Sequence, residues 1–147
     1  IVQTTEQGPW WLSTGVLASY NDGQNGFVDS ATIGVLLERT QGPVNTKLNA
    51  SLENFMDSNS ALDDRHVIHT ALDSTYAFSK EFGVGAQWYA TYGDDLDLGD
   101  SHLLGPVAKG QLAVGKDSKL DWEASYLWGL TDDSTDSLIH FQVGYGF

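Results

Sequence analysis

The sequence contains no cysteine and few basic residues, and each absence excludes a class of protein. Without cysteine the chain can form neither a disulfide nor a thiolate metal site, and it has no cysteine nucleophile. Only 7 Lys and Arg stand against 20 Asp and Glu, which gives a formal net charge of −13 at pH 7. Such a field repels phosphate backbones, so we expect no nucleic-acid partner.

Long apolar runs are also absent. The longest, at 33–37, is about a third of the roughly eighteen apolar residues that a membrane helix requires. Without such a run a chain can span a bilayer only as a closed β-barrel, because every backbone N–H and C=O must be hydrogen-bonded inside lipid. The sequence begins at Ile1 with neither Met nor a signal peptide, so we expect a processed form or a fragment.

The residues that are abundant suit strands. The length of 147 residues predicts a single domain over 1–147, and a hydrophobic share of 41% is typical of a folded protein. The chain has 5 Trp, 6 Tyr, 6 Phe and 16 Gly. This mixture favours strands and tight turns over helices.

Apolar residues recur at every second position, most clearly at the C-terminus. The alternate apolar positions there are Ile139, Phe141, Val143, Tyr145 and Phe147. The positions between them are polar or glycine, and the segments 120–128 and 82–92 repeat the pattern. A period of two predicts strands with one apolar and one polar face.

Eight such segments, each about 10 to 13 residues long, follow one another along the chain. They lie near 9–20, 28–40, 45–55, 66–77, 81–92, 103–114, 119–130 and 138–147. Strands of soluble proteins have about 5 or 6 residues, whereas membrane strands need about 9 to 11. The sequence therefore predicts an all-β fold, an antiparallel up-and-down transmembrane β-barrel. About eight of its strands lie in this chain, which is either a whole barrel or the C-terminal part of a larger one.

The connections between these segments alternate in length. The short ones are 41–43, 79–80 and 116–118, and the longer, Asp-rich ones lie near 21–27, 56–65, 93–102 and 131–137. Bacterial barrels have short periplasmic turns and longer outer loops. Because Lys80, Lys116 and Lys119 fall at the short turns, loop length and charge predict the same orientation in the outer membrane.

Aromatic residues lie near the expected strand ends. Trp10, Phe82 and Phe147 fall at the ends towards the short turns, and Tyr20, Tyr92 and Trp128 near the ends towards the longer loops. Aromatic girdles at both interfaces are typical of membrane barrels, so we expect membrane lipid to be a partner. The alternative is that aromatic residues simply favour strands.

The last seven residues, 141–147, resemble the C-terminal signature of Gram-negative outer-membrane barrels, a terminal Phe preceded by apolar residues at alternate positions. In that class the barrel-assembly machinery recognises the last strand, and the resemblance implies this role for Val143, Tyr145 and Phe147. The stretch 122–147 looks like the final hairpin of the outer-membrane transporters grouped with the phenol meta-degradation pathway. This second resemblance implies a porin-like role in passive transport and carries no catalytic motif.

Polar residues occupy the positions opposite the apolar ones, where they would face the lumen. These residues are Glu38, Lys47, Glu53, His69, Asp73, Lys109, Gln111, Asp121, Glu123 and His140. In an eight-stranded barrel, whose interior side chains can fill, we expect Lys109 and Glu123 on adjacent strands to pair and plug the lumen, which would make the chain a small structural barrel. In a barrel of more strands the same face would select solutes, and its acidic excess would favour cations.

The Asp-rich loop at 93–100 raises the question of calcium. Hard cations bind several carboxylate oxygens, so weakly bound Ca²⁺ at the outer rim, where lipopolysaccharide also holds such ions, is one interpretation. The candidate ligands are Asp94, Asp95, Asp97 and Asp100. The loop lacks the spacing and the terminal Glu of an EF-hand, which favours solvated surface carboxylates, and we expect no cofactor.

Two other functions stay open. One is a soluble secreted β-sandwich binding module whose acidic loops hold calcium and sugar. The other is a lipid-modifying outer-membrane enzyme, for which the chain offers many serines and the histidines His66, His69, His102 and His140. No spacing among them predicts a nucleophile with its base, so we expect no enzyme. Strand length and the terminal Phe favour the barrel over the sandwich.

Overall fold

The chain is seen here as a computed structural model that describes residues 2–4, 13–21, 29–56, 65–93, 100–114 and 118–146. Its strands are β1 (Val2–Thr4), β2 (Ser13–Asn21), β3 (Asp29–Gln41), β4 (Val44–Met56), β5 (Arg65–Ala77), β6 (Gly83–Gly93), β7 (Ser101–Ala113), β8 (Lys119–Gly129) and β9 (Ser137–Gly146). Each strand pairs antiparallel with the next one in sequence, so the sheet runs in order from β1 to β9. Among the described residues no helix is long and apolar enough to cross a membrane.

The eight longer strands, β2 to β9, coincide with the eight expected ones to within a few residues. They are between 9 and 13 residues long, as for β2 and β3. The prediction of an all-β antiparallel fold is therefore confirmed. The sequence pattern did not predict the three-residue strand β1, and residues 9–12 of the first expected strand lie outside the described residues.

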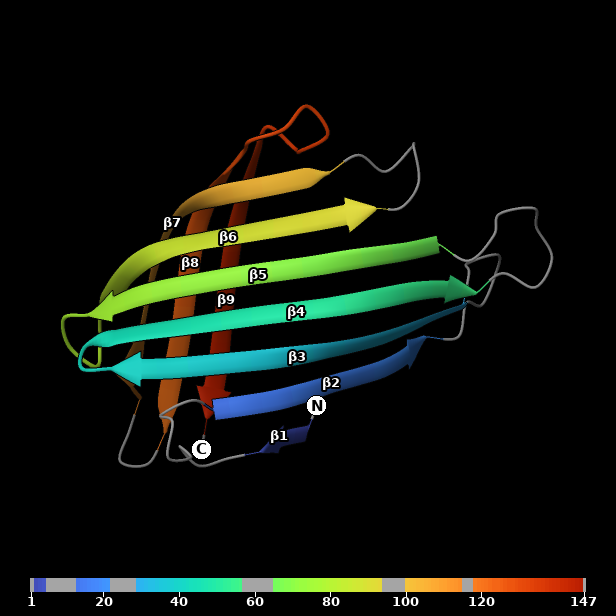
Figure 1. Cartoon of the computed structure of the whole chain (residues 1–147). Coiled ribbons are helices and arrows are strands. Elements are labelled where there is room, and N and C mark those ends of the chain that lie inside the picture. Colours follow the sequence, from blue (N-terminus) through green and yellow to red (C-terminus); the bar gives the residue numbers. More distant parts are fainter. Residues whose placement is uncertain are drawn as a thin grey trace.

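The sheet is curled into about half of a barrel. Figure 1 shows β2 to β6 side by side in front, with β8 and β9 crossing behind them. Within the described part of the chain, β9 pairs with β8 and no pairing joins β9 to β2. The strands thus have the order and direction of an up-and-down barrel, while the sheet of described residues stays open.

The strand register separates the side chains into two faces. Exposed large apolar side chains of the strands share one face, here called the apolar face, with Leu138 as the exception. Across β2, β3 and β4, for example, Val16 lies beside Val35, and Val35 beside Ala50. The opposite face, here called the polar face, carries the ionisable side chains predicted to line a lumen.

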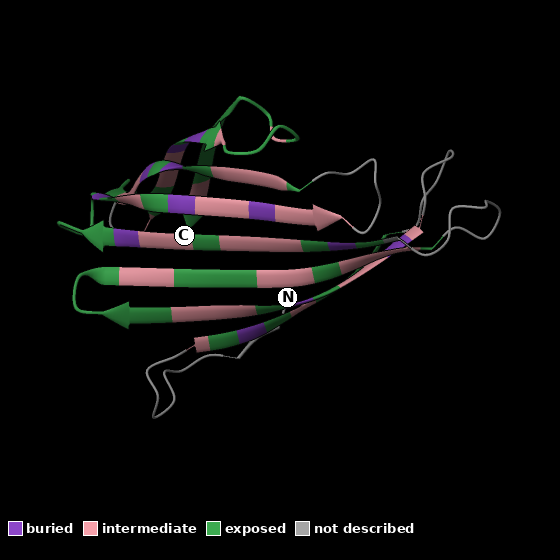
Figure 2. Ribbon diagram, turned by 45° about the horizontal axis from the view of Figure 1, so that its top comes forward, coloured by how far each residue is buried: buried purple, intermediate pink, exposed green. Residues whose placement is uncertain are grey.

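Few side chains of the described residues are fully buried. The buried apolar residues are Val67, Ala90, Val107 and Leu127. Figure 2 shows most of each strand in the colours of intermediate or exposed residues. A single sheet of this kind has little core, because its apolar face has nothing to pack against within the described residues.

Two short turns fix the register of their hairpins. Gly42 has a φ of 58°, in the left-handed region that glycine adopts without steric cost, and it closes the tight turn between β3 and β4. In the turn at 78–82, the N–H groups of Phe78 and Ser79 both donate to the carbonyl oxygen of Phe82 at 3.1 Å. The Ser79 hydroxyl, hydrogen-bonded to the side chain of Glu81, lowers the pKa of that carboxyl from its usual value.

The turn at 78–82 packs against Gly110 of β7. A Cβ atom at Gly110 would overlap the carbonyl oxygen of Glu81. Beside this contact the rings of Phe82 and Trp122 are stacked, with centroids 6.4 Å apart. The absence of a side chain at Gly110 therefore lets this turn lie on the neighbouring strand.

Replacing Gly110 by alanine should destabilise the fold, because the turn at 78–82 must move away. We expect G110A to lower the free energy of unfolding by about 1–3 kcal/mol, as other overpacked sites do. Urea titration of the folded chain measures this. The matched control is G144A, whose added Cβ would lie 3.8 Å from the Cβ of Asp121 and should change stability by less than about 0.5 kcal/mol. Equal losses in the two variants would contradict the packing described here.

Candidate functional site

All ten residues predicted to face the lumen lie on the polar face. The register pairs Lys47 with both Glu38 and Asp73, and it continues through the neighbouring strands to the others, Glu53, His69, Lys109, Gln111, Asp121, Glu123 and His140. Sequence alternation therefore identified one side of the sheet. It did not indicate which of these side chains meet.

Five polar side chains from five consecutive strands, β5 to β9, come together and are called the polar cluster. They are Asp73, Gln87, Lys109, Glu123 and His140. The Lys109 ammonium lies 2.7 Å from Oδ1 of Asp73 and 3.9 Å from Oε2 of Glu123. The Gln87 amide donates to Oδ2 of Asp73 at 2.8 Å and to Oε1 of Glu123 at 2.6 Å. His140 approaches the cluster with its Nδ1 3.7 Å from Oε1 of Glu123.

Two contacts of the polar cluster cross an intervening strand. Asp73 on β5 meets Lys109 on β7 across β6, and Gln87 on β6 meets Glu123 on β8 across β7. Adjacent strands lie about 4.8 Å apart, so alternate strands of a flat sheet are separated by about twice that distance. Side chains that converge across an intervening strand show that the polar face is the concave one.

Burial strengthens these interactions. Gln87 is 2% exposed, and the side chains of Asp73, Lys109 and Glu123 are 15%, 24% and 23% exposed. Hydrogen bonds to charged groups contribute about 1.5–3 kcal/mol each, more than neutral ones. Within the described part of the chain, Oε1 of Gln87 and Oγ of Ser125 are buried and have no hydrogen-bond partner.

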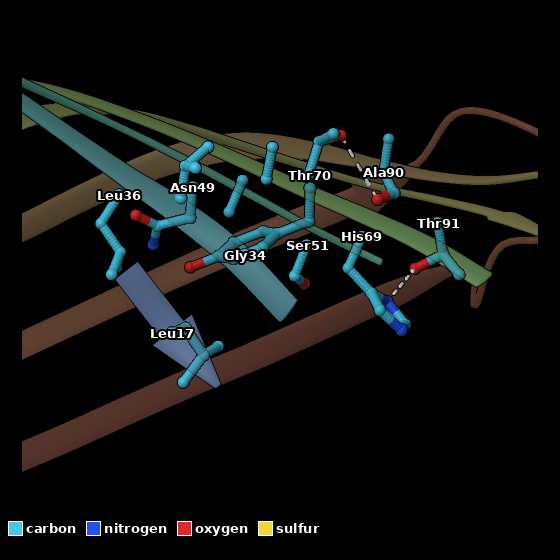
Figure 3. Close-up of a pocket in the computed structure, with 13 residues that line it drawn as sticks. Leu17, Gly34, Leu36, Asn49, Ser51, His69, Thr70, Ala90 and Thr91 are labelled. Atoms are coloured by element: carbon cyan, nitrogen blue, oxygen red, sulfur yellow. Dashed lines mark hydrogen bonds between the residues drawn. The ribbon is translucent and has the colours of Figure 1, made fainter. Parts of the chain in front are cut away.

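A second polar group lies nearer the ends of β4, β5 and β6 that are farther from the short turns. Nε2 of His69 is 3.2 Å from Oε2 of Glu53, and its Nδ1 is 3.3 Å from Oγ1 of Thr91. Of these residues, His69 and Thr91 line a hollow of about 300 Å³ on the polar face, shown in Figure 3. The absence of a side chain at Gly34 leaves space in this hollow, since a Cβ atom there would lie 2.7 Å from the Cβ of Ser51. The lining includes Leu17, Leu36, Asn49, His69, Tyr89 and Thr91.

Two further hollows lie next to the polar cluster, towards the short turns. Their volumes are about 300 and 420 Å³, and both are bordered by Lys47, Lys109, Gly110 and Glu123. One extends towards Glu38 and Lys80, and the other towards Asp121 and Gln142. The ammonium of Lys109 therefore borders open space as well as its carboxylate partners.

The described residues give little support to the interpretation that the Asp-rich loop binds calcium. Among them no group of three or more His, Asp or Glu is placed to hold a metal ion. Asp94, Asp95 and Asp97 lie outside the described residues. Asp100 is described, and its backbone carbonyl accepts a hydrogen bond from the Thr131 hydroxyl at 2.6 Å.

The residues assigned to assembly by resemblance lie at the end of the sheet. Val143 and Tyr145 are exposed on the apolar face of β9, and Phe147 lies outside the described residues. Their recognition by an assembly machinery stays a prediction.

Aromatic side chains gather near both ends of the strands. At the short-turn end the rings of Tyr76 and Phe78 lie 5.0 Å apart, and those of Phe78 and Phe82 lie 6.1 Å apart. At the other end the ring centroids of Tyr126 and Trp128 lie 5.1 Å apart. Of the six expected girdle residues, Trp10 and Phe147 lie outside the described residues; Tyr20, Tyr92 and Trp128 are on the apolar face, and Phe82 is in the turn before β6.

Two structural features of this region were not predicted from the sequence. Gln87 follows Gly83 and Gly85 at the alternate positions of its segment, and only its amide at the centre of the polar cluster distinguishes it. Ser134 holds the loop at 130–136, since its hydroxyl accepts from the N–H of His102 at 2.8 Å and donates to the carbonyl of His102 at 2.9 Å. Neither role has a sequence signal, because both depend on contacts between distant segments.

Comparison of the chain with protein-family models, with curated proteins and with solved structures finds no match. The resemblance of the last hairpin to a transporter group is therefore untested.

Removing the Gln87 amide should weaken the polar cluster, because Asp73 and Glu123 would each lose a charge-assisted hydrogen bond. We expect Q87L to lower the free energy of unfolding by about 1–3 kcal/mol. The control is Q111L, since Gln111 donates to Asp121 at 2.8 Å on the same face but in an exposed setting. That change should cost less than about 0.5 kcal/mol. If both variants unfold at the same urea concentration as the parent chain, the cluster contributes no stability.

Proposed function

We propose that the chain forms a bacterial outer-membrane β-barrel, with its apolar face against lipid and its polar face around an aqueous lumen, and that it conducts small cations passively. The observation that carries this proposal is the distribution of exposed large apolar side chains. On the strands they share one face, Leu138 excepted. Soluble monomers rarely expose contiguous apolar patches larger than a few hundred Å², which a face of eight strands far exceeds.

The dimensions of the strands also support a membrane location. From Phe82 to Tyr92, along β6, the backbone advances by about 33 Å at about 3.3 Å per residue. With a tilt of about 40° this corresponds to a height of about 25 Å, the height of the apolar band of outer-membrane barrels. The two aromatic ends of this strand would then lie at the two interfaces.

Closure of the sheet is part of the proposal. In hydrocarbon the free edge of β9 must be hydrogen-bonded, because no water is available to it. Strands β2 to β9 alternate in direction, so β2 and β9 run opposite to one another. A barrel of eight strands, or a larger one with an even number of further strands between these edges, would therefore keep antiparallel pairing throughout. Closure also requires β1, which pairs with residues 14–16 of β2, to leave that edge.

The charge of the polar face favours cations over anions. Among its described side chains, five carboxylates (Glu38, Glu53, Asp73, Asp121 and Glu123) stand against the three ammonium groups of Lys47, Lys109 and Lys119. Rings of carboxylates select cations in pores. The net charge of −13 acts in the same direction at the mouths of the barrel.

An enzyme is less well supported. Thr91, His69 and Glu53 form a chain of hydroxyl, imidazole and carboxylate, with distances of 3.3 and 3.2 Å. Acyl transfer also needs N–H donors directed at the developing oxyanion. Around these residues the backbone N–H groups of β4, β5 and β6 serve the strand ladders, so this chain of residues is better explained as a hydrogen-bonded part of the inner wall.

Heat-modifiable migration and circular dichroism of the purified chain in detergent test whether a barrel forms. We expect a β-rich spectrum and a compact unboiled band that shifts on boiling. Conductance across a planar bilayer then tests the function, and the reversal potential in a KCl gradient should have the sign of a cation-preferring pore. A chain that stays monomeric and soluble without detergent would overturn the proposal and direct attention to calcium and sugar binding. A folded barrel without conductance would retain the membrane location and remove the transport role.

A charged residue on the apolar face distinguishes a membrane barrel from a soluble sheet. Val35, in the middle of β3, is half-exposed on this face, and Gln41 ends the same strand on the same face. In lipid, V35R should cost about 2–4 kcal/mol, as arginine does at the bilayer midplane, and Q41R about 0–1 kcal/mol. In water an exposed substitution should change stability by no more than about 0.5 kcal/mol at either position. Urea titration in lipid vesicles gives both values, and equal small effects would exclude lipid contact at Val35.

A further inference from the structure

Asp73 and Glu123 each have one carboxylate oxygen nearest Gln87 and the other nearest Lys109. Each carboxylate directs one oxygen to the amide of Gln87, at 2.8 Å from Asp73 and 2.6 Å from Glu123. The other oxygen of each is the one nearest the Lys109 ammonium, at 2.7 Å from Asp73 and 3.9 Å from Glu123. The amide therefore fixes the two carboxylates at a set separation, with an ammonium group between their remaining oxygens.

The position of Gln87 distinguishes this arrangement from an ordinary surface ion pair. Gln87 is 2% exposed, its amide lies within the cluster, and its Oε1 has no hydrogen-bond partner among the described residues. The pair of Lys47 and Glu38 on the same face differs, since its atoms are 3.7 Å apart and the Lys47 side chain is 48% exposed. The Asn45 amide donates to Oε1 of Glu38 at 2.7 Å, but its other acceptor is the Thr40 hydroxyl and not a second carboxylate. The acceptors of the polar cluster are thus held in place independently of the lysine.

The ammonium of Lys109 satisfies neither all the hydrogen-bonding capacity nor all the negative charge of this site. An ammonium group has three N–H donors, and at 3.9 Å the Glu123 oxygen is too distant for a hydrogen bond. Two carboxylates against one ammonium leave one negative charge. The hollows of about 300 and 420 Å³ both border Lys109 and Glu123, so a solute reaches the cluster from the side of the Glu123 carboxylate.

From this geometry we infer that Asp73, Gln87 and Glu123 form a binding site for a primary ammonium group, which Lys109 fills with its own side chain. The ligand class is that of small primary amines in their charged form. Lysine suits the tethered role because its ammonium is a compact charge on a flexible four-carbon stem. This inference deepens the proposed function, on which it rests, since it gives passing cations a place on the inner wall where they compete with Lys109.

Chemical complementation of a lysine-free variant tests the inference. In K109A the full chain, folded in detergent, should unfold at a lower temperature than the parent, because the two carboxylates face each other without a cation. Butylammonium chloride should raise that unfolding temperature in a saturable manner. Tetramethylammonium chloride at the same ionic strength has no N–H donor and should not. The fraction of compact band remaining after heating provides the readout.

The control is K47A, whose lysine pairs with Glu38 in the exposed setting described above and should give no selective response to butylammonium. If folded K109A responds equally to both salts, or to neither, the ammonium site does not exist. A heat-modifiable parent chain in the same experiment would show that the barrel proposal survives that result. Absence of heat modification in the parent chain would instead overturn the barrel.

A refolding experiment and a second variant cover the case in which K109A does not fold without an added amine. Folding of K109A from urea with butylammonium, but not with tetramethylammonium, supports the inference, whereas failure with both salts contradicts it. The double variant D73N/K109A, with one carboxylate removed, should fold more readily than K109A and lose the selective response to butylammonium. A response that persists unchanged in the double variant would show that Asp73 takes no part in the site.

Discussion

Backbone hydrogen bonding between neighbouring strands is the constraint on which the other features of this molecule depend. Each of β3 to β8 pairs with a strand on either side, whereas β9 pairs with β8 alone, and these ladders fix which residues lie side by side. Because the side-chain period of a strand is two, a slip of one residue would transfer Val35 to the polar face and Glu38 to the apolar face. The tight turn at Gly42 helps to prevent this slip, since it fixes the pairing of β3 with β4.

Curvature follows from side-chain size on the two faces. Strand glycines concentrate on the polar, concave face: Gly15, Gly34, Gly83, Gly85, Gly93, Gly105, Gly129, Gly144 and Gly146, with Gly110 on the other face. Side chains crowd together on the inside of a curled sheet, and glycine relieves that crowding. The same curl brings Asp73 to Lys109 across β6, so the polar cluster depends on small residues elsewhere on its face.

The period-two pattern made most of the fold predictable. It located β6, β8 and β9 to within a few residues and sorted side chains such as Glu53 and His140 onto one face. It could not give contacts between strands that are not adjacent, because these depend on curvature. Lys109 was expected to pair with Glu123, which lies 3.9 Å away, and its shorter contact is with Asp73 at 2.7 Å. Gln87 was missed for the same reason, since its contact with Glu123 on β8 crosses β7, although Asp73 is its direct neighbour on β5.

The proposed division into a lipid-facing and a water-facing side can be measured directly, because the chain has no cysteine and single labelled cysteines can be introduced without background. Nitroxide labels at successive positions 48–53 of β4, in the chain reconstituted in lipid vesicles, would report accessibility to oxygen, which concentrates in lipid, and to a water-soluble nickel chelate. We expect oxygen accessibility to peak at Leu48, Ala50 and Leu52, and nickel accessibility at Asn49, Ser51 and Glu53. Accessibility to nickel at all six positions, without a period of two, would contradict a lipid-facing sheet.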